Sequence, residues 1–440
     1  MLLGILQVSF FMNNIKKIYN IFQKSSGVYT DSRNTLKNGL FFALTGEKFD
    51  GNDYALESIN KGAIAAVVDN KEVAEKSNKI IYVNDTLTTL QKLASFYREK
   101  FKCPVFAITG SNGKTTTKEL LKIVLSQKYD THATYGNLNN HIGVPLTILN
   151  SPLSSEFLII EMGANHLKEI EHLCQIAKPS HGYITNFGLA HLEGFGGKDG
   201  VIKGKSELYD FLDLSKGEIF VNHDNKNQII KLAKKKYISF GQEEKAYFNI
   251  KYNLFNKNNL ELNFKGYKFL SNLHGEYNLP NISAAIIIGY YFNVPIKKIQ
   301  KAIKSYKSFE NRSQKIQLKD KKIILDAYNA NPSSMESAIK NFYKKFKTDN
   351  LLIIGDMLEL GLYSKSAHSN IVELIKTLSF DRVITVGKTF FKINKTPNFF
   401  MKFNSTNELI KYIKSNKIKE SNILIKGSRS LTLEKIIKHL

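Results

Sequence analysis

The 440-residue sequence contains little cysteine and no obvious membrane-spanning segment. Cys103 and Cys174 lie far apart and form neither a CxxC pair nor a Cys/His metal spacing, so neither a disulfide framework nor a structural zinc site is implied. The apolar start, Met1 to Met12, is too short to cross a bilayer and lacks the basic residues and cleavage site of a signal peptide. We therefore expect a cytoplasmic protein without integral membrane association. Met12 is an alternative start, which would make the apolar leader an artefact.

Internal repeats and low-complexity linkers are also lacking, so the domains have to be inferred from the order of strands and helices. Apolar residues make up 42% of the chain and charged residues 23%, which is typical of a folded protein. A chain of 440 residues exceeds what one hydrophobic core usually supports. The pattern divides it into blocks at residues 1–100, 101–310 and 311–440, which we expect to be three α/β domains.

The formal net charge of +24 raises the question of a nucleic-acid partner. Binding grooves concentrate basic residues on one face, whereas these lysines are scattered through the whole chain. We therefore expect a lysine-rich, solvated surface and no nucleic acid, although a basic protein could still attract a diphosphate substrate.

Short, continuous apolar runs alternate with helical patterns in the second and third blocks. Val105 to Ile108, Phe157 to Ile160 and Ile323 to Leu325 are examples, and such runs predict parallel strands that are buried on both faces. The first block ends in a helix expected over Thr86 to Lys100. Asp326 follows a strand of the third block, where open α/β sheets bind ligands, so this block is expected to face a nucleotide.

The most specific motif is TGSNGKTTT at residues 109–117, placed between an expected strand and an expected helix. Backbone N–H groups of such a loop can surround phosphate oxygens, while Lys114 neutralises charge and the Thr115 hydroxyl can hold Mg²⁺. The spacing is Gly110-x-x-Gly113-Lys114-Thr115 and not the common GxxxxGK[ST]. The residues expected to contact phosphate are Gly110, Ser111, Asn112, Gly113, Lys114, Thr115 and Thr116.

Two further residues lie at the ends of apolar runs. Glu161 is placed where a P-loop enzyme organises magnesium. His191 lies in a turn rich in small residues after another run, and the residue types alone favour a metal-side role and a structural role about equally. Lys203 and Lys205 would, on the same grounds, be basic helix surface.

Together these motifs resemble the Mur ligase family of peptidoglycan synthesis, and the resemblance covers nearly the whole chain. TGSNGKTTT, EMGAN at 161–165 and NFGLAHLE at 186–193 are similar to the family's central ATPase domain. NLNNHIGVP at 137–145, DAYNANP at 326–332 and GDMLELG at 355–361 resemble one branch. That branch joins D-alanyl-D-alanine to UDP-N-acetylmuramoyl tripeptide.

The resemblance implies a fold and a chemistry. The fold would comprise a small α/β UDP-substrate domain, a central P-loop mononucleotide-binding domain with a parallel sheet, and a C-terminal Rossmann-like α/β domain. The chemistry would use ATP and Mg²⁺ to convert the tripeptide carboxylate into an acyl phosphate, which the dipeptide amine attacks. It also implies a role in cell-wall biogenesis, cell shape and cell division, and we expect a monomer.

The resemblance also assigns residues. Lys114, Glu161, His191 and Lys205 would be catalytic, and the metal ligands would be Thr115, Glu161, His191 and a carbamylated Lys205. The nucleotide would contact Asn278 and Asn281 at its adenine, and Arg312, Asp326 and Asn329 elsewhere. The expected substrate residues are Asp31, Ser32, Arg33, Thr45, Gly46, Asn137, Asn139 and Asn140. The branch often has a second acid and a serine beside Asp326, where this chain has Leu325 and Ala327, so no role is assigned to those side chains.

Other functions are compatible with parts of the pattern. A ligase adding a single amino acid, or a folylpolyglutamate synthase, would share the loop and the lysine but should lack the segments at 137–145 and 326–332. A P-loop NTPase stimulated by nucleic acid would account for the charge. A catalytically silent binding module would not be expected to keep Lys114, Thr115, Glu161, His191 and Lys205.

Overall fold

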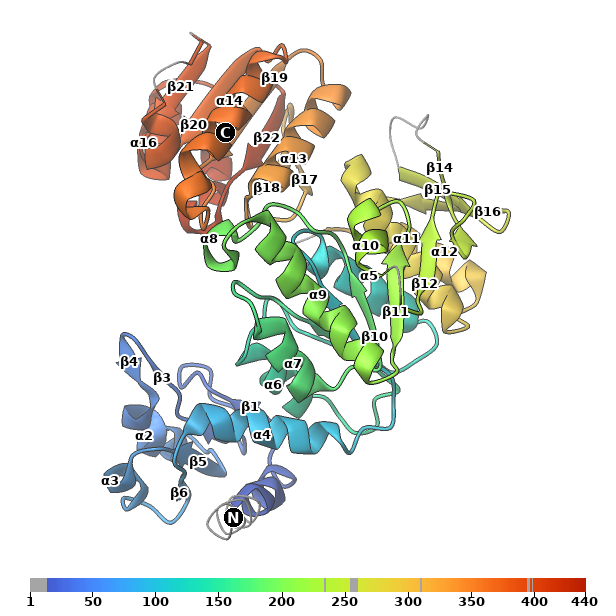
Figure 1. The fold of residues 1–440 in the computed structure, drawn as a ribbon. Helices are drawn as coiled ribbons and strands as arrows, with labels where there is room; N and C mark the ends of the chain where they lie inside the picture. The colour runs from blue at the N-terminus through green and yellow to red at the C-terminus, as the bar shows by residue number, and fades with distance from the viewer. Residues whose placement is uncertain (1–13, 233–234, 254–259, 309–310, 394–395, 398) are drawn as a thin grey trace.

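The computed structural model describes residues 14–232, 235–253, 260–308, 311–393, 396–397 and 399–440. The expected alternative start and the apolar leader before it lie outside the described residues. Three sheets with covering helices follow one another along the chain, from the blue N-terminal part through green and yellow to the red C-terminal part (Figure 1). Among the residues that the structure describes, no helix is both long and apolar enough to cross a membrane.

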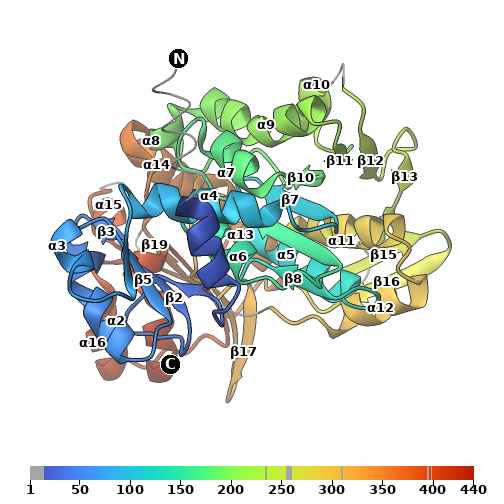
Figure 2. The same ribbon diagram turned by 90° about the horizontal axis from the view of Figure 1, so that it is seen from below.

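The N-terminal part is a parallel sheet of four strands in the order β1-β2-β5-β6, followed by a long helix, α4. Helix α4 begins after Asp85, whose side chain accepts the N–H of Thr88, and it packs on α6 and α7 of the central part (Figure 2). The helix expected over 86–100 is therefore present, two residues shorter. The elements are β1 (Val28–Tyr29), β2 (Leu40–Phe42), β3 (Thr45–Gly46), β4 (Phe49–Asp50), η1 (Gly51–Tyr54), α2 (Ala55–Asn60), β5 (Ala65–Val68), α3 (Lys71–Ala74), β6 (Ile80–Tyr82) and α4 (Thr86–Arg98).

The central part is built on a parallel sheet of seven strands in the order β13-β12-β11-β10-β7-β9-β8. All five residues of β7 are buried, and alternate residues enter two different cores: Phe106 and Ile108 pack with α5 and α11, while Val105 and Ala107 pack with α7 and α9. A strand covered on both faces needs no polar alternation, which explains the continuous apolar runs. The strands are β7 (Val105–Thr109), β8 (Thr131–Ala133), β9 (Phe157–Glu161), β10 (His181–Ile184), β11 (Glu218–Asn222), β12 (Ile238–Gly241) and β13 (Phe248–Asn249).

A small antiparallel sheet, β14-β15-β16, flanks the central domain next to α11 and α12. Its strands are β14 (Lys251–Asn253), β15 (Leu260–Phe264) and β16 (Tyr267–Ser271). The helices of the central part are α5 (Lys114–Leu125), α6 (Gly143–Leu149), α7 (Glu169–Ala177), α8 (Leu192–Phe195), α9 (Lys198–Leu214), α10 (Lys226–Lys231), η2 (Glu276–Asn278), α11 (Leu279–Tyr291) and α12 (Ile296–Ser305).

The C-terminal part is a six-stranded sheet in the order β17-β18-β22-β19-β20-β21, parallel except for the edge strand β17. Its elements are β17 (Gln314–Leu318), β18 (Lys321–Asp326), α13 (Pro332–Lys345), β19 (Asn350–Gly355), η3 (Gly361–Tyr363), α14 (Ser364–Lys376), β20 (Arg382–Val386), α15 (Lys388–Phe391), β21 (Phe400–Phe403), α16 (Thr406–Ser415), β22 (Asn422–Lys426), η4 (Arg429–Leu431) and η5 (Leu433–His439). The predicted three-domain α/β fold with a central parallel sheet is confirmed.

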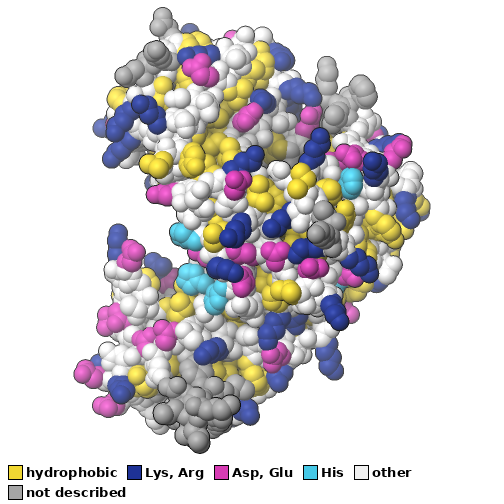
Figure 3. Space-filling view, in the orientation of Figure 1, with side chains coloured by type: hydrophobic (Ala, Val, Ile, Leu, Met, Phe, Trp, Pro, Cys, Tyr) yellow, Lys and Arg dark blue, Asp and Glu magenta, His cyan; other side chains and the backbone are white. Residues whose placement is uncertain are grey.

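The surface agrees with the scattered lysines of the sequence. On the face shown in Figure 3, lysine and arginine side chains are interspersed with aspartate and glutamate and do not merge into one basic groove. This face therefore offers no concentrated binding track for a polyanion.

Candidate active site

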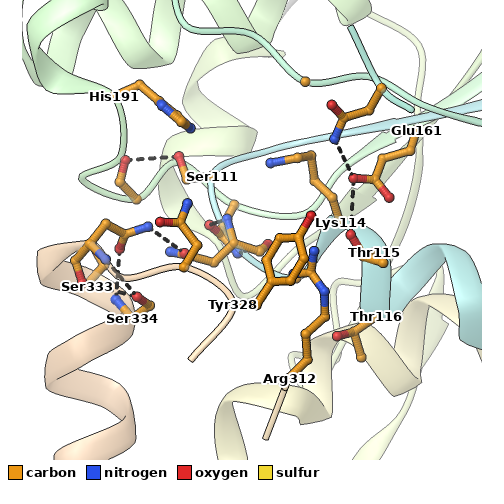
Figure 4. Close-up of a pocket in the computed structure, with 18 of the residues that line it drawn as sticks. Ser111, Lys114, Thr115, Thr116, Glu161, His191, Arg312, Tyr328, Ser333 and Ser334 are labelled. Carbon is orange, nitrogen blue, oxygen red and sulfur yellow. Dashed lines mark hydrogen bonds between the residues drawn. The ribbon is translucent and has the colours of Figure 1, made fainter. Parts of the chain in front are cut away.

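A cavity of ≈ 730 Å³ lies between the central and C-terminal parts of the molecule. Figure 4 shows that the glycine loop and Glu161 come from the central side, while Tyr328, Ser333 and Ser334 come from the C-terminal side. Most of the residues assigned from the sequence line it: Ser111, Asn112, Gly113, Lys114, Thr115, Thr116, Asn137, Asn139, Asn140, Glu161, His191, Asn278, Asn281, Arg312, Asp326 and Asn329.

Two glycines make the phosphate loop possible. Gly110 has φ +132° and Gly113 has φ +81°, conformations that other residues rarely adopt. A Cβ on Gly110 would lie 2.1 Å from the Thr185 hydroxyl, and one on Gly113 would lie 2.6 Å from the Asn281 amide oxygen. At both glycines the loop thus packs closely against a neighbouring segment.

The turn after β10 holds this loop in place. The N–H of Ser111 donates to Asn186 O at 3.0 Å, and the N–H of Asn112 donates to Asn186 Oδ1 at 3.1 Å. The Ser111 hydroxyl donates to Gly188 O, and the Thr185 hydroxyl donates to Asn112 O. These hydrogen bonds fix the backbone of the loop around the position expected for phosphate.

Lys114 is the first residue of α5, so its ammonium lies at the positive end of a helix that opens onto the cavity. Its Nζ donates to Gly110 O at 2.8 Å. Burial lowers the pKa of Lys114, the Glu161 carboxylate opposes that change, and the Arg312 guanidinium adds to it. A cation at a helix N-terminus that opens onto a cavity is suited to an anionic phosphate group.

Glu161 ends β9 and is almost fully buried. Its Oε1 accepts hydrogen bonds from the Thr115 hydroxyl at 3.1 Å and from Asn139 Nδ2 at 2.7 Å. Its Oε2 is buried and accepts no hydrogen bond among the described residues; the nearest cation in an ion pair with it is Lys118, at 3.6 Å. A buried carboxylate oxygen without a hydrogen-bond donor, close to a threonine hydroxyl, fits a divalent cation.

His191 has a left-handed backbone (φ 54°) and pairs through Nδ1 with the Glu359 carboxylate of the C-terminal part. Glu359 is also left-handed (φ 61°), and its carbonyl oxygen accepts the N–H of Glu193 at 3.4 Å. The pairing with His191 lowers the pKa of Glu359. Two strained residues in contact across the cavity mouth join the two domains at the side of the site.

Lys205 and Lys203 have different environments, although the sequence alone predicted surface for both. Lys203 is exposed, whereas Lys205 is completely buried. Lys205 Nζ donates to Ala164 O at 2.9 Å and lies over the Phe195 ring, just outside the residues that line the cavity. Burial, reinforced by Lys114, holds the pKa of Lys205 well below its ordinary value, which favours the neutral, nucleophilic amine.

The residues expected at the nucleotide surround the other end of the cavity. Asn281 Nδ2 donates to Asn278 Oδ1, and the Thr117 hydroxyl donates to Asn281 Oδ1, so these two amides fix one another and the start of α11. Arg312 stacks 3.5 Å from the centre of the Tyr328 ring, and its Nε is buried without a hydrogen-bond acceptor in the described part of the chain. A free guanidinium N–H in a cavity is suited to a phosphate or ribose oxygen.

Asp326 is held at the carboxyl end of β18. Its Oδ1 accepts the N–H of Ser313 at 3.0 Å, and its Oδ2 pairs with Lys426 Nζ at 2.5 Å. The same Lys426 donates to Asn329 O at 3.3 Å. Asp326, Asn329 and Lys426 thus form one network at the C-terminal wall of the cavity.

The expected UDP-binding residues lie in the N-terminal part and not in this cavity. Asp31 forms an exposed ion pair with Arg33, and that contact lowers the pKa of Asp31 to about 2. Ser32 accepts a hydrogen bond from Thr35 at its carbonyl oxygen. Thr45, beside Gly46 in the β3–β4 hairpin, donates to Asp50 and borders a separate hollow of ≈ 410 Å³.

Several residues at the cavity were not singled out from the sequence. Among them, Tyr277, Tyr328 and Ser333 line the cavity, and Glu359 meets His191. Glu359 belongs to the GDMLELG motif but gave no signal of its own, because its role depends on a contact between domains. Among the described residues, no cluster of three or more His, Cys, Asp or Glu side chains is arranged to hold a metal.

Comparison with known proteins gives the same family along the whole chain. Residues 24–98 match the model described as "Mur ligase family, catalytic domain", residues 108–289 match "Mur ligase middle domain", and residues 311–429 match "Mur ligase, glutamate ligase domain". A phosphate loop, a buried carboxylate and a facing C-terminal sheet define an ATP-dependent ligase that forms amide bonds. The chain belongs to the Mur ligase family, which confirms the resemblance found in its motifs.

The most similar relatives include the UDP-N-acetylmuramoyl-tripeptide–D-alanyl-D-alanine ligases of Bacillus subtilis (34% identical) and Escherichia coli (32%). These alignments cover 94% of this chain and 93% of each relative. The MurF crystal structure from Acinetobacter baumannii superposes with a TM-score of 0.82 at 28% identity over 95% of this chain and 97% of that one. MurF from Thermotoga maritima in complex with ADP gives 0.81 at 26% identity, with coverage of 95% and 97%. Folylpolyglutamate synthase from the same organism shares the fold alone, at 14% identity.

Proposed function

We infer that this chain joins D-alanyl-D-alanine to the peptide carboxylate of UDP-N-acetylmuramoyl tripeptide, with conversion of ATP to ADP and phosphate. The observation that carries this inference is a single cavity that combines the phosphate loop, the NLNN turn at 137–140 and the DAYNANP segment. These are the segments that distinguish the branch, in a chain that aligns with such ligases over 94% of its length. The product would be the UDP-linked pentapeptide of peptidoglycan synthesis.

The chemistry requires activation of a carboxylate, whose own leaving group would be oxide. Transfer of the γ-phosphoryl group from ATP to a carboxylate oxygen gives an acyl phosphate and ADP. The dipeptide amine then attacks the acyl carbon, the C–O bond to phosphate breaks, and the amine loses a proton as the amide forms. The protein contributes positioning and charge neutralisation, for which Lys114 at the helix terminus and Arg312 are placed.

Magnesium fits the residues around Glu161. The donor-free Oε2 of Glu161 and the hydroxyl of Thr115 would hold it, and His191 would contribute its other ring nitrogen, Nε2, while Nδ1 keeps its pair with Glu359. One carboxylate completed by substrate phosphates is a common magnesium environment, so a closed cluster of protein ligands is not required. When bound, the ion would neutralise charge on the phosphoryl group being transferred.

Carbamylation of Lys205 is a further part of the proposal. A neutral amine adds to carbon dioxide and loses one proton, which turns a cation site into an anion. The low pKa of Lys205 favours that neutral amine, and Ala164, whose carbonyl accepts its hydrogen bond, lines the cavity. The resulting carbamate would add an anionic ligand close to the magnesium site.

The remaining assignments complete the proposal. Residues 1–100 would hold the UDP end of the substrate through Asp31, Ser32, Arg33, Thr45 and Gly46, residues 101–310 the triphosphate, and residues 311–440 would close over both and exclude water. A cytoplasmic enzyme fits the two free thiols and a nucleotide-linked substrate. We also propose a monomer, and cell shape and division would depend on its product.

A ligation assay read by mass tests the proposal. Purified protein receives ATP, Mg²⁺, D-alanyl-D-alanine and a UDP-muramoyl tripeptide with either of the two common diamino acids at the third position. The expected result is pentapeptide formation that depends on all components, with ATP hydrolysis slow when the dipeptide is omitted. Rapid ATP turnover without dipeptide and without pentapeptide, or stimulation of turnover by DNA, would point to the NTPase alternative.

A further inference from the structure

Lys118 is a buried lysine beside the cavity that the proposed chemistry does not use. It follows Lys114 by one turn of α5, on the same face of the helix, but it is 0% exposed and lies behind the lining residues. An ammonium group removed from water costs several kcal/mol unless oxygen atoms surround it. The oxygen atoms around Lys118 therefore indicate which parts of the structure this buried charge stabilises.

Three oxygen atoms from three elements surround the Lys118 ammonium. Nζ donates to Gly136 O at 3.0 Å, lies 3.0 Å from Glu119 Oε1, and lies 3.6 Å from Glu161 Oε2. Gly136 belongs to the turn after β8, Glu119 to α5, and Glu161 to the end of β9. The side chain thus connects the helix of the phosphate loop, the magnesium-side carboxylate and the turn.

The same turn reaches Glu161 by a second route. Asn139 Nδ2 donates to Glu161 Oε1 at 2.7 Å, and Asn139 O accepts the N–H of Gly163 at 2.7 Å. Each oxygen of the carboxylate therefore faces the turn, one directly through Asn139 and the other through Lys118 and Gly136. Asn137 and Asn139 of this turn line the cavity, so any shift of the turn moves the cavity wall.

We propose that Lys118 is a positioning residue that fastens the turn at 136–140 to Glu161 and thereby fixes the wall that receives the muramoyl peptide. This step rests on the ligase activity inferred above. Lys118 does not reach the cavity and acts only through the turn and the carboxylate. The phosphate loop is held separately by Thr185 and Asn186, so nucleotide binding by this loop in the absence of Mg²⁺ should not depend on Lys118.

The test compares Lys118→Met, Lys118→Arg and the matched control Lys122→Met, which removes an exposed lysine one turn further along α5. Loss of a charge-assisted hydrogen bond predicts that Lys118→Met raises the KM for UDP-muramoyl tripeptide by at least roughly tenfold. The affinity for ADP, measured without Mg²⁺ so that Glu161 is not involved as a metal ligand, should change less than about twofold, because the phosphate loop keeps its own contacts. Lys118→Arg, which keeps the positive charge, should have a tripeptide KM close to that of the unmodified protein. Lys122→Met should also resemble the unmodified protein.

Backbone hydrogen exchange gives a second measurement that needs no activity. Exchange of the amides at 136–143 should accelerate in Lys118→Met and not in Lys122→Met. Unchanged tripeptide KM and unchanged exchange in a folded Lys118→Met protein would overturn the proposal, as would a loss of metal-free ADP affinity as large as the rise in tripeptide KM. If Lys118→Met does not fold, Lys118→Gln, whose shorter and uncharged side chain cannot reproduce the contacts with both Gly136 and Glu161, is tested against the same expectations. Absence of ligation by the unmodified protein would refute the inferred activity, while the exchange experiment would still decide the role of Lys118.

Discussion

The buried pair between Asp326 and Lys426 permits a quantitative test of how the C-terminal wall is held together. Lys426 is 2% exposed, and its Nζ has two described acceptors, the carboxylate of Asp326 at 2.5 Å and the carbonyl of Asn329 at 3.3 Å. Asp326→Asn leaves this ammonium buried with no counter-charge. Breaking one side of a buried pair costs about 3–5 kcal/mol, whereas removing both charges costs much less.

We therefore expect Asp326→Asn to lower the stability of the C-terminal domain by about 3 kcal/mol, a fall in its melting temperature of roughly 10 °C. The double variant Asp326→Asn/Lys426→Met should be at least about 1 kcal/mol more stable than the sum of the two single changes predicts. Thermal and urea unfolding of the four ligand-free proteins supplies the cycle. Strict additivity, or a loss below about 1 kcal/mol in Asp326→Asn, would show that solvent already screens the pair and that this reasoning is wrong.

Three further predictions concern the site and its supports. Glu359→Gln should weaken the contact with His191 by about 0.5–1 kcal/mol. We expect kcat to fall several-fold, with little change in the Kd for ADP measured by calorimetry. An unchanged kcat would refute this prediction. Lys205→Met should abolish ligation yet leave the melting temperature equal or higher, because it removes a desolvated amine. The control Lys203→Met should keep both the ligation activity and the melting temperature of the unmodified protein. Substantial ligation by Lys205→Met would contradict the assignment. Burial lowers the pKa of His181 to about 4, so below about pH 6.5 the unfolded chain binds a proton that the folded protein does not bind. The free energy of unfolding should therefore fall by up to about 3 kcal/mol between pH 6.5 and pH 4. If urea titrations in acid show an equal fall for a His181→Phe variant, His181 is not the cause.

Local patterns in the sequence were sufficient to predict the fold class. Continuous apolar runs such as Phe157 to Ile160 are buried strands, and the helix expected from Thr86 is α4. Glycine spacing and strand context also placed Lys114 and Glu161, because a phosphate loop and the end of the adjacent strand meet by topology alone. Such features depend on neighbours within about twenty residues or on the edge of one sheet.

Features that depend on distant contacts could not be predicted. Lys205 is buried and Lys203 is exposed because the helix packs one face against Ala164 and Phe195. The residue types alone do not indicate which face of the helix is buried. Glu359 meets His191 only after two domains have packed together. Lys118 could have been noticed as the residue one turn after Lys114. Its partners Gly136 and Glu161, however, lie in two other segments of the chain, and the sequence does not show that these segments come close to Lys118.

The tight packing around Gly110 and Gly113 has a consequence for how this enzyme can change over generations. Both positions combine positive φ with neighbours closer than 3 Å to any added carbon, so every single-nucleotide change that alters either residue introduces strain at the phosphate loop. Substitutions in the lysine-rich surface do not strain the loop, whereas any substitution at these two positions does. Substitutions within this loop would thus offer few routes to resistance against an inhibitor whose contacts are confined to its backbone.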